Sequence, residues 1–462
     1  MMKTTLVIRY IAVVCVAFTA SCSDYLDAVP DRSLSVLTKI SEYQQLLDNA
    51  QIYINAPGIA EIGTDDLYLT NDMWLATWVL PRNAYVWAAD FYEGNTAVGY
   101  TSDWTYPYET IYYTNVVLDG LRRLEVSSAE SDEYNEVKGH ALFLRALHHY
   151  FLQEIFGQPY RPESASADLG IPLKLSSELS QTLYRATVQE TFGQIVRDLQ
   201  EALALLPENY QTANMFRASK AATHALLSRV YLTLQDYEKS LDHADACLGM
   251  YDVLLDFNDL APSYNLPSPH NAEVLFKIRQ VGHLPGLNPI IDPGLYASYS
   301  DDDLRKNTFF QLQESSGTPR IKTLYSGGTT PMSGLATDEV YLNSAECRAR
   351  MGDSDGAMRD LNKLLEHRYA AGSFDPVAAV SPDEVLRKVL LERRKELVFR
   401  GTRWTDLRRL NQDPAYAVTL TRTLDGTEYR LPPNSSNYTY PIPLNEIVMN
   451  GFPQNERNET SN

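Results

Sequence analysis

Apolar residues recur every three to four positions over eight stretches of the chain, which is the spacing of an amphipathic helix. The stretches that show this spacing are 107–124, 132–156, 187–206, 219–234, 237–250, 337–351, 355–369 and 382–400. Thr187 with Glu190 forms a capping-box pattern at the start of the third, and Gly157 and Pro159 follow the second as stop signals. The pattern predicts a mainly all-α protein.

Two of the predicted helix pairs repeat each other at an offset of 117 residues without a gap. The aligned positions include Ser228 with Ala345, Asp236 with Asp353, Ser240 with Ala357 and Ala244 with Leu361. Small residues recur where two helices must approach closely, and this spacing resembles the tetratricopeptide helix pair of about 34 residues. Such pairs bury their apolar faces only by stacking on neighbours. We therefore expect helical repeats over about 107–250 and 337–400.

The stretches 52–106 and 251–336 show no helical periodicity and are far longer than ordinary loops, which indicates a functional role. Trp74 and Trp78 in the first stretch have polar neighbours, a mixture that suits a sugar site because a pyranose offers an apolar face to a ring and hydroxyls to its edge. Tyr296 and Tyr299 form a second pair of candidates. These four aromatic residues are the predicted ligand contacts.

The formal charge of the chain is −19, with 59 acidic and 40 basic residues. Proteins that bind nucleic acid need a basic face, and no cluster of Lys and Arg interleaved with aromatic residues is present. The charge therefore excludes nucleic acid as a partner. The length of 462 residues and the 44% hydrophobic content allow one large globular domain or two closely associated ones.

The N-terminal residues have the features of an export signal rather than of a folded element. Lys3 and Arg9 are followed by an apolar run over 11–20, which is too short to span a bilayer, and then by Ser21 and Cys22. A small residue before Cys22 resembles a bacterial lipoprotein cleavage box. We expect residues 1–21 to be the signal peptide, 22–462 the mature domain, and Cys22 the lipidated residue that holds the protein to the membrane.

Sequence motifs over nearly the whole chain resemble the SusD/RagB family of outer-membrane nutrient-binding lipoproteins. They are CSDYLD at 22–27, ALFLRA at 141–146, DLRK at 303–306, ERRKEL at 392–397, GTRWTDL at 401–407 and YPIP at 440–443. Arg400 stands where the family commonly has Glu. The resemblance implies a helical repeat scaffold on the cell surface that docks on a SusC-like TonB-dependent transporter, with 52–106 and 251–336 forming the ligand face. Most members of known role bind glycans, and some relatives bind peptides.

Several polar clusters also admit a structural interpretation. The charges at 392–396, Arg403 and Asp406 are typical of an ion-pair network, His148 and His149 are adjacent and so point to different faces, and Asp301–Asp303 lacks the spaced ligands of a calcium loop. We expect no catalytic residue, no cofactor and no metal. A glycosidase, a peptide-binding member of the family and an assembly scaffold remain as alternatives, and pairing of Cys247 with Cys347 stays open.

The first prediction concerns Cys22. The Cys22→Ser variant cannot accept acyl chains, so it should move from the membrane fraction to the soluble fraction or be mislocalised. Fractionation of cells that express the variant and the parent protein measures this. Retention of the variant in the membrane fraction, at the level of the parent, would contradict the anchor.

Overall fold

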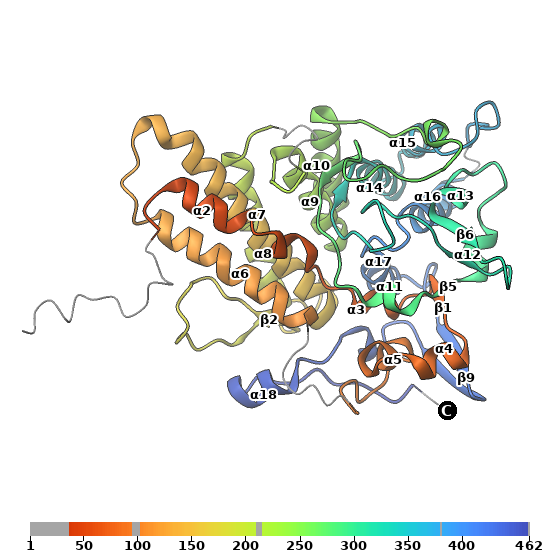
Figure 1. Cartoon of the computed structure of the whole chain (residues 1–462), viewed down its shortest axis with the longest axis horizontal. Coiled ribbons are helices and arrows are strands. Elements are labelled where there is room, and N and C mark those ends of the chain that lie inside the picture. The colour runs from red at the N-terminus through yellow and green to blue at the C-terminus, as the bar shows by residue number, and fades with distance from the viewer. Residues whose placement is uncertain (1–36, 95–101, 209–214, 379–380, 461–462) are drawn as a thin grey trace, which may run out of the picture.

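The computed structural model describes residues 37–94, 102–208, 215–378 and 381–460, so the signal peptide and Cys22 lie outside the described residues. Its long helices pass from left to upper right in Figure 1. They are α2 (Ile40–Leu47), α6 (Ser102–Leu121), α7 (Ser131–Phe156), α8 (Val188–Leu205), α9 (Lys220–Thr233), α10 (Tyr237–Met250), α14 (Thr337–Arg350), α15 (Ser354–Glu366) and α16 (Pro382–Glu396). All eight predicted helices are confirmed, and α2 is an additional one.

The helices stack in chain order, each packing on the next. Helix α6 packs on α7, α7 on α8, α9 on α10 and α10 on α14, while α14 also contacts α15 and α16. Because each pair buries the apolar face of its neighbour, one continuous core runs from Ile40 in α2 to Val340 in α14. The predicted repeat architecture is therefore confirmed.

The two repeats at the predicted offset have the same local structure. Helices α9 and α14 begin 117 residues apart, as do α10 and α15. Asp236 and Asp353 cap α10 and α15 by accepting hydrogen bonds from the amides of Lys239 and Gly356. The residues before these caps, Gln235 and Gly352, both have positive φ, 58° and 87°. The close approach predicted at the small residues is present, since the Ser240 hydroxyl donates to the Ser228 carbonyl at 2.8 Å.

The rest of the chain consists of short elements, and 52–106 and 251–336 are less irregular than predicted. Two of the short helices, η1 (Ala50–Ile54) and η2 (Ser128–Glu130), pack on the repeat helices. The others, which largely form a second layer, are α3 (Ile59–Ile62), α4 (Asn71–Ala76), α5 (Val79–Tyr85), η4 (Phe257–Leu260), α11 (His283–Leu287), α12 (Pro293–Ala297), α13 (Arg305–Phe309), α17 (Arg403–Leu410), η5 (Ser436–Tyr438) and α18 (Leu444–Asn450). One or two turns are too short to show a periodic pattern, and tertiary packing stabilises them instead.

The short strands pair as two-stranded antiparallel sheets, and the pair at 169–187 packs on α7 and α8 rather than in the second layer. They are β1 (Leu67–Tyr68) with β5 (Ile290–Ile291), β2 (Leu169–Pro172) with β3 (Arg185–Thr187), β4 (Val274–Phe276) with β8 (Leu335–Ala336), β6 (Phe310–Leu312) with β7 (Pro319–Ile321), and β9 (Leu420–Leu424) with β10 (Thr427–Leu431). The β1–β5 pair joins 52–106 to 251–336, and the β4–β8 pair joins two parts of 251–336 and packs on α9 of the repeats.

A buried cluster of charges joins the two layers at Arg305, whose side chain is fully buried. The guanidinium group donates two hydrogen bonds to Asp303, at 2.8 and 2.7 Å, and one each to Glu392 and Glu396 of α16, at 2.5 and 3.0 Å. Lys395 bridges Asp303 and Glu392 at 2.8 and 3.0 Å. Of the run Asp301–Asp303, Asp303 is therefore not a surface residue, because its carboxylate is fully buried in this cluster.

Arg368 continues the same cluster on the far side of Glu396. Its Nε donates to Glu396 at 2.8 Å and its Nη2 to Glu273 at 2.7 Å, and all three side chains are fully buried. The Tyr325 hydroxyl donates to Glu273 at 2.6 Å. We call these residues, with Asp303, Arg305, Glu392 and Lys395, the Arg305–Arg368 network. It confirms the structural interpretation of the charges at 392–396.

Three further observations bear on expectations from the sequence. Arg400, which stands where the family commonly has Glu, donates to Asp338 at 2.9 Å in the buried interior. The arginine at this position therefore has an ion-pair partner. Cys247 and Cys347 are both buried and carry free thiols. Within the described ranges no helix is long and apolar enough to cross a membrane.

The second prediction concerns Glu396, which is shared by Arg305 and Arg368. Removing one partner from a buried ion pair leaves an uncompensated charge, so Glu396→Ala should lower the free energy of unfolding by about 3–5 kcal/mol. Chemical denaturation followed by circular dichroism measures it.

The matched control is Glu428→Ala, which breaks the exposed pair of Glu428 with Arg430 on β10. Exposed pairs contribute about 0–1 kcal/mol. Equal losses in the two variants would show that the network does not carry the fold.

Candidate functional site

An open pocket of about 450 Å³ lies in the second layer, between the β1–β5 pair and β9. Four segments far apart in the sequence meet there, in the lower right of Figure 1. Its lining residues are Asp65, Leu67, Tyr68, Tyr85, Asp292, Arg394, Val418, Thr419, Leu420, Thr421, Arg422 and Thr423. We call it the β1–β9 pocket.

Local backbone pairing brings Tyr68 and Asp292 to this pocket. Tyr68 pairs with Ile290 across the β1–β5 sheet, and the amide of Asp292 donates to the Asp66 carbonyl at 3.0 Å. Asp292 then caps α12 by accepting from the Leu295 amide at 2.8 Å. The Tyr68 side chain is 44% exposed, which leaves its ring accessible to a ligand.

Strand β9 presents a row of hydroxyl groups to the pocket. Thr419, Thr421 and Thr423 are exposed, whereas Leu420 and Arg422 between them are buried. This alternation follows from the period of two in a strand, which sends successive side chains to opposite faces. The three threonines therefore supply hydrogen-bond donors and acceptors along one wall.

The charged groups of the pocket are held by mutual ion pairs. Arg403 forms two parallel hydrogen bonds to Asp65, at 2.7 and 2.8 Å, and Arg394 donates to Asp66 at 2.9 Å. Burial disfavours the ionised form of Asp65, yet the guanidinium groups of Arg403 and Arg394 hold its pKa below the usual value. Burial raises the pKa of Asp66, and Arg394 opposes that effect only in part.

Adjacent carboxyl groups whose pKa values diverge are a feature of acid and base catalysis, so Asp65 and Asp66 need to be weighed as such a pair. Asp66 is 0% exposed and does not line the pocket. Both oxygens of Asp65 accept hydrogen bonds from Arg403. A general acid must reach the leaving oxygen of its substrate. This geometry does not provide that contact, and the pocket is suited to binding.

The four aromatic residues predicted from the sequence have different surroundings. Trp78 precedes α5 and is 86% exposed, while Trp74 is half-buried, with its ring Nε1 donating to the Arg82 carbonyl at 3.0 Å and its ring packed against Tyr429. Tyr296 is half-buried against Phe310. None of the four lines the β1–β9 pocket. Trp74 and Trp78 lie in the sequence between the lining residues Tyr68 and Tyr85, and the two tyrosines follow Asp292.

Tyr299 is a packing residue, and its prediction as a ligand contact was wrong. It is 1% exposed, and its hydroxyl donates to the Lys395 carbonyl at 2.7 Å. An aromatic residue in a long loop can be part of the core when the loop folds over it, as this one does. The sequence also missed Tyr68, Asp292 and Arg394, since no local pattern relates residues that are hundreds of positions apart.

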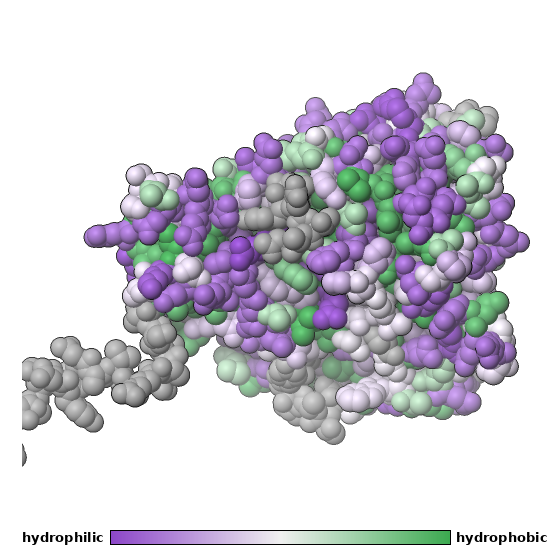
Figure 2. All heavy atoms as spheres, turned by 45° about the horizontal axis from the view of Figure 1, so that its top comes forward, coloured by the Kyte–Doolittle hydropathy of each residue, from purple (hydrophilic) through white to green (hydrophobic). Residues whose placement is uncertain are grey.

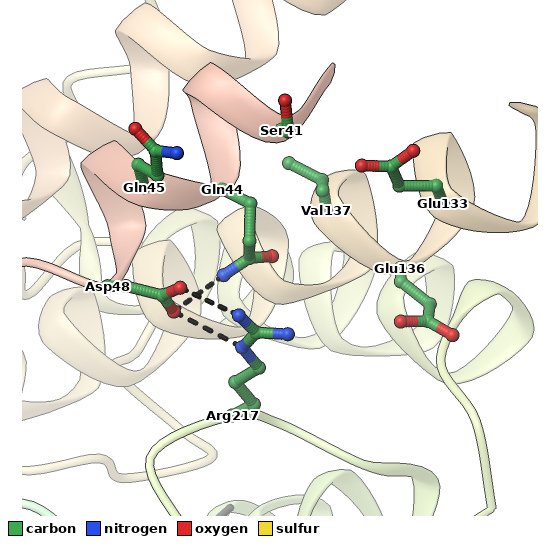
Figure 3. A pocket seen from close by; sticks show the side chains of 8 residues that line it. All are labelled: Ser41, Gln44, Gln45, Asp48, Glu133, Glu136, Val137 and Arg217. Atoms are coloured by element: carbon green, nitrogen blue, oxygen red, sulfur yellow. Dashed lines mark hydrogen bonds and ion pairs between the residues drawn. The ribbon is translucent and has the colours of Figure 1, made fainter. Parts of the chain in front are cut away.

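A second pocket of about 250 Å³ lies between α2 and α7, and Figure 3 shows its lining. Ser41, Gln44, Gln45 and Asp48 come from α2 and the segment that follows it, and face Glu133, Glu136 and Val137 of α7. Arg217 reaches Asp48 at 2.7 Å. The lining contains no aromatic ring, so it lacks the stacking surface of the β1–β9 pocket.

The described residues contain no group of three or more His, Cys, Asp or Glu side chains placed to hold a metal ion. Burial lowers the pKa of His148 and of His149 to about 3, and neither ring has a hydrogen-bond partner. The face in Figure 2 is covered mostly by hydrophilic side chains with small apolar areas between them, in keeping with the high charge.

Comparison with known proteins gives consistent matches along the chain. Residues 24–232 match a family model described as "starch-binding associating with outer membrane", and residues 298–459 match the model of the SusD family. The curated SusD-like protein P2 of Formosa agariphila is 25% identical over 347 residues, which cover 61% of this chain and 66% of that protein.

Solved structures share the fold over nearly the whole chain. A putative sugar-binding protein from Bacteroides vulgatus superposes with a TM-score of 0.72 and 22% identity, covering 91% of this chain and 99% of the other. A protein described as a laminarin-binding SusD-like protein superposes with a TM-score of 0.65 and 16% identity, covering 91% and 99%. At these identities the likeness concerns the fold.

Proposed function

Because the chain belongs to the SusD/RagB family, whose members are outer-membrane-associated binding proteins, we propose that it captures an oligosaccharide and delivers it to a SusC-like TonB-dependent transporter. The β1–β9 pocket is the observation that carries the proposal. It combines an exposed phenol ring, Tyr68, with carboxylates, a guanidinium group and three threonine hydroxyls.

The chemistry of these groups fits a sugar better than a peptide. A pyranose has an apolar face that stacks on an aromatic ring and a rim of hydroxyls that both donate and accept hydrogen bonds. Asp292 accepts, Arg394 donates, and the threonines do both. Peptides are the other class of ligand that members of this family bind. A site for an extended peptide usually offers an unpaired strand edge or a deep apolar pocket, and the row of threonine hydroxyls provides neither.

The exposed Trp78 extends the same proposal. It lies beyond the pocket on the link between α4 and α5, and Asn71 at the start of α4 accepts from the amide of Asp425 in the β9–β10 turn at 2.7 Å. A ligand longer than one or two sugar units that leaves the pocket along β9 has Trp78 and Trp74 as further rings. We retain Trp74, Trp78 and Tyr296 as outer contacts and assign the central ones to the pocket.

The third prediction tests the pocket by calorimetry against a panel of neutral oligosaccharides. Tyr68→Ala and Asp292→Ala should each weaken binding by roughly 1–3 kcal/mol, as central contacts do at other interfaces. Trp78→Ala should weaken long ligands more than short ones. Thin-layer chromatography of the same mixtures should show no shorter sugars, because a binding protein leaves its ligand intact. A glycosidase would release such products.

Tyr184→Ala is the matched control, because Tyr184 is also an exposed tyrosine, at 78%, and lies between β2 and β3, outside the pocket. It should bind as the parent protein does. The pocket would be rejected as the ligand site if Tyr68→Ala and Asp292→Ala kept the parental affinity while thermal melts showed all variants folded.

The fourth prediction concerns the transporter. Stacked helices present broad, rigid surfaces, so we propose that the repeats rather than the pocket layer contact the partner. Co-purification in mild detergent should recover a large barrel protein. Charge reversal at two exposed positions of α15, Arg359→Glu with Lys363→Glu, should reduce recovery, and Arg430→Glu on β10 should not. Recovery of the chain alone in several detergents would count against the contact.

A further inference from the structure

Two histidines face each other between the helices of the first repeat. His224 of α9 and His243 of α10 place their Nδ1 atoms 2.8 Å apart, with the ring planes inclined at 44°. Both side chains are half-buried, so the pair is open to solvent on one side. The two histidines are nineteen positions apart in the sequence, so no local pattern reveals that they meet.

The surrounding structure fixes the pair in place. Tyr231 stacks on His243, with ring centroids 5.5 Å apart and planes inclined at 7°. The helices that carry the two histidines are joined by the Ser240–Ser228 hydrogen bond, and Ala225 and Ala244 next to them are buried. Side chains on a packed helix pair lose little further freedom when they bind a ligand, so the site is preorganised.

The two rings are in the protonation state that a metal ligand requires. Burial lowers the pKa of His224 to about 4, with a further contribution from His243, and burial also lowers the pKa of His243. At neutral pH both imidazoles are therefore uncharged. One Nδ1 donates a proton to the other. A metal ion that displaces this proton to solvent lies to one side of the line between the two nitrogens, because two metal–nitrogen bonds of about 2.0 Å do not fit within a 2.8 Å separation.

The separation of the nitrogens favours a particular class of ion. With metal–nitrogen distances of about 2.0–2.1 Å, two ligands at a right angle lie about 2.9 Å apart, and two at the tetrahedral angle about 3.3 Å apart. The observed 2.8 Å is the length of a hydrogen bond between the two rings, and it is also near the first value, so the two nitrogens are close enough to be shared by one ion. Right angles between ligands are typical of Cu²⁺ and Ni²⁺, and copper binds nitrogen ligands most tightly among the divalent ions of its row.

The second repeat shows what the same positions do without imidazoles. At the offset of 117, His224 and His243 correspond to Tyr341 and Asp360, and Tyr231 to Arg348. There Arg348 donates to Asp360 at 2.9 Å, so an ion pair joins the two helices at the positions that the histidines and Tyr231 occupy in the first repeat. The backbone of the two repeats is alike, so the histidine pair is a property of these two side chains and not a requirement of the helix pair.

We propose that His224 and His243 form a binding site for a divalent transition-metal ion, Cu²⁺ in preference to Zn²⁺, with water completing the coordination. The ion links α9 to α10 and stabilises the first repeat. Lys220, one turn before His224, opposes the bound charge, while Asp242 beside His243 favours it. With two protein ligands and this balance of charge, we expect a modest affinity.

The fifth prediction is tested by calorimetry on the tag-free chain carrying Cys22→Ser, titrated with Cu²⁺ and then with Zn²⁺. We expect one equivalent of Cu²⁺ to bind, more tightly than Zn²⁺, and the melting temperature to rise with Cu²⁺ concentration because the metal binds the folded state. His224→Gln and His243→Gln should each weaken binding at least tenfold. His270→Gln, which removes a single exposed histidine, is the control and should bind as the parent does.

Electron paramagnetic resonance of the Cu²⁺-loaded parent protein identifies the ligands without any substitution. Nitrogen hyperfine coupling from two imidazoles is the expected spectrum. The proposal is overturned if the parent binds no Cu²⁺ at 100 µM metal, a concentration of roughly the weak limit for a useful site. It is equally overturned if both Gln variants, shown to be folded by circular dichroism, bind Cu²⁺ as the parent does. The histidine pair would then be a hydrogen-bonded contact between the helices and not a metal site.

Discussion

The sharing of the Glu396 carboxylate between Arg305 and Arg368 is the constraint on which the rest of the structure depends. Its two oxygens accept at 2.8 and 3.0 Å from guanidinium groups that belong to different segments, and none of the three side chains is exposed. Buried charges are tolerated only when every partner is in place, since desolvation of each ion costs several kcal/mol. The network therefore specifies one arrangement of 251–336 on α16 and disfavours others.

The same helix connects this constraint to the pocket. Glu392 and Glu396 lie one turn apart on α16 and face the network, while Arg394 between them points to another side, where it contacts Asp66 and lines the β1–β9 pocket. The position of a ligand-facing guanidinium group is thus set by charges buried on the opposite face of its helix. Binding residues on irregular segments need such support, because loops alone do not hold a geometry.

The parts of the molecule with a regular period were predictable from the sequence, and the parts assembled from distant segments were not. The apolar spacing located eight helices, and the offset of 117 residues located the two repeats with their caps at Asp236 and Asp353. The short helices of 52–106 have too few turns to show a periodic pattern. Tyr299 was predicted as a ligand contact because the residues around it in the sequence do not indicate that the folded loop buries it. Tyr68 and Asp292 meet through the β1–β5 pairing, a long-range contact that no local pattern encodes.

The central claim is that the β1–β9 pocket, and not a groove between helix pairs, receives the ligand. Hydrogen–deuterium exchange with and without a bound oligosaccharide tests it most directly, because it reports on every segment at once. The account predicts the strongest added protection at residues 65–68, the start of α12 and residues 418–423 of the β9 wall, with weaker protection at the outer contacts around α4 and α5. Protection confined to α9, α10, α14 or α15, with the β9 wall unchanged, would contradict it.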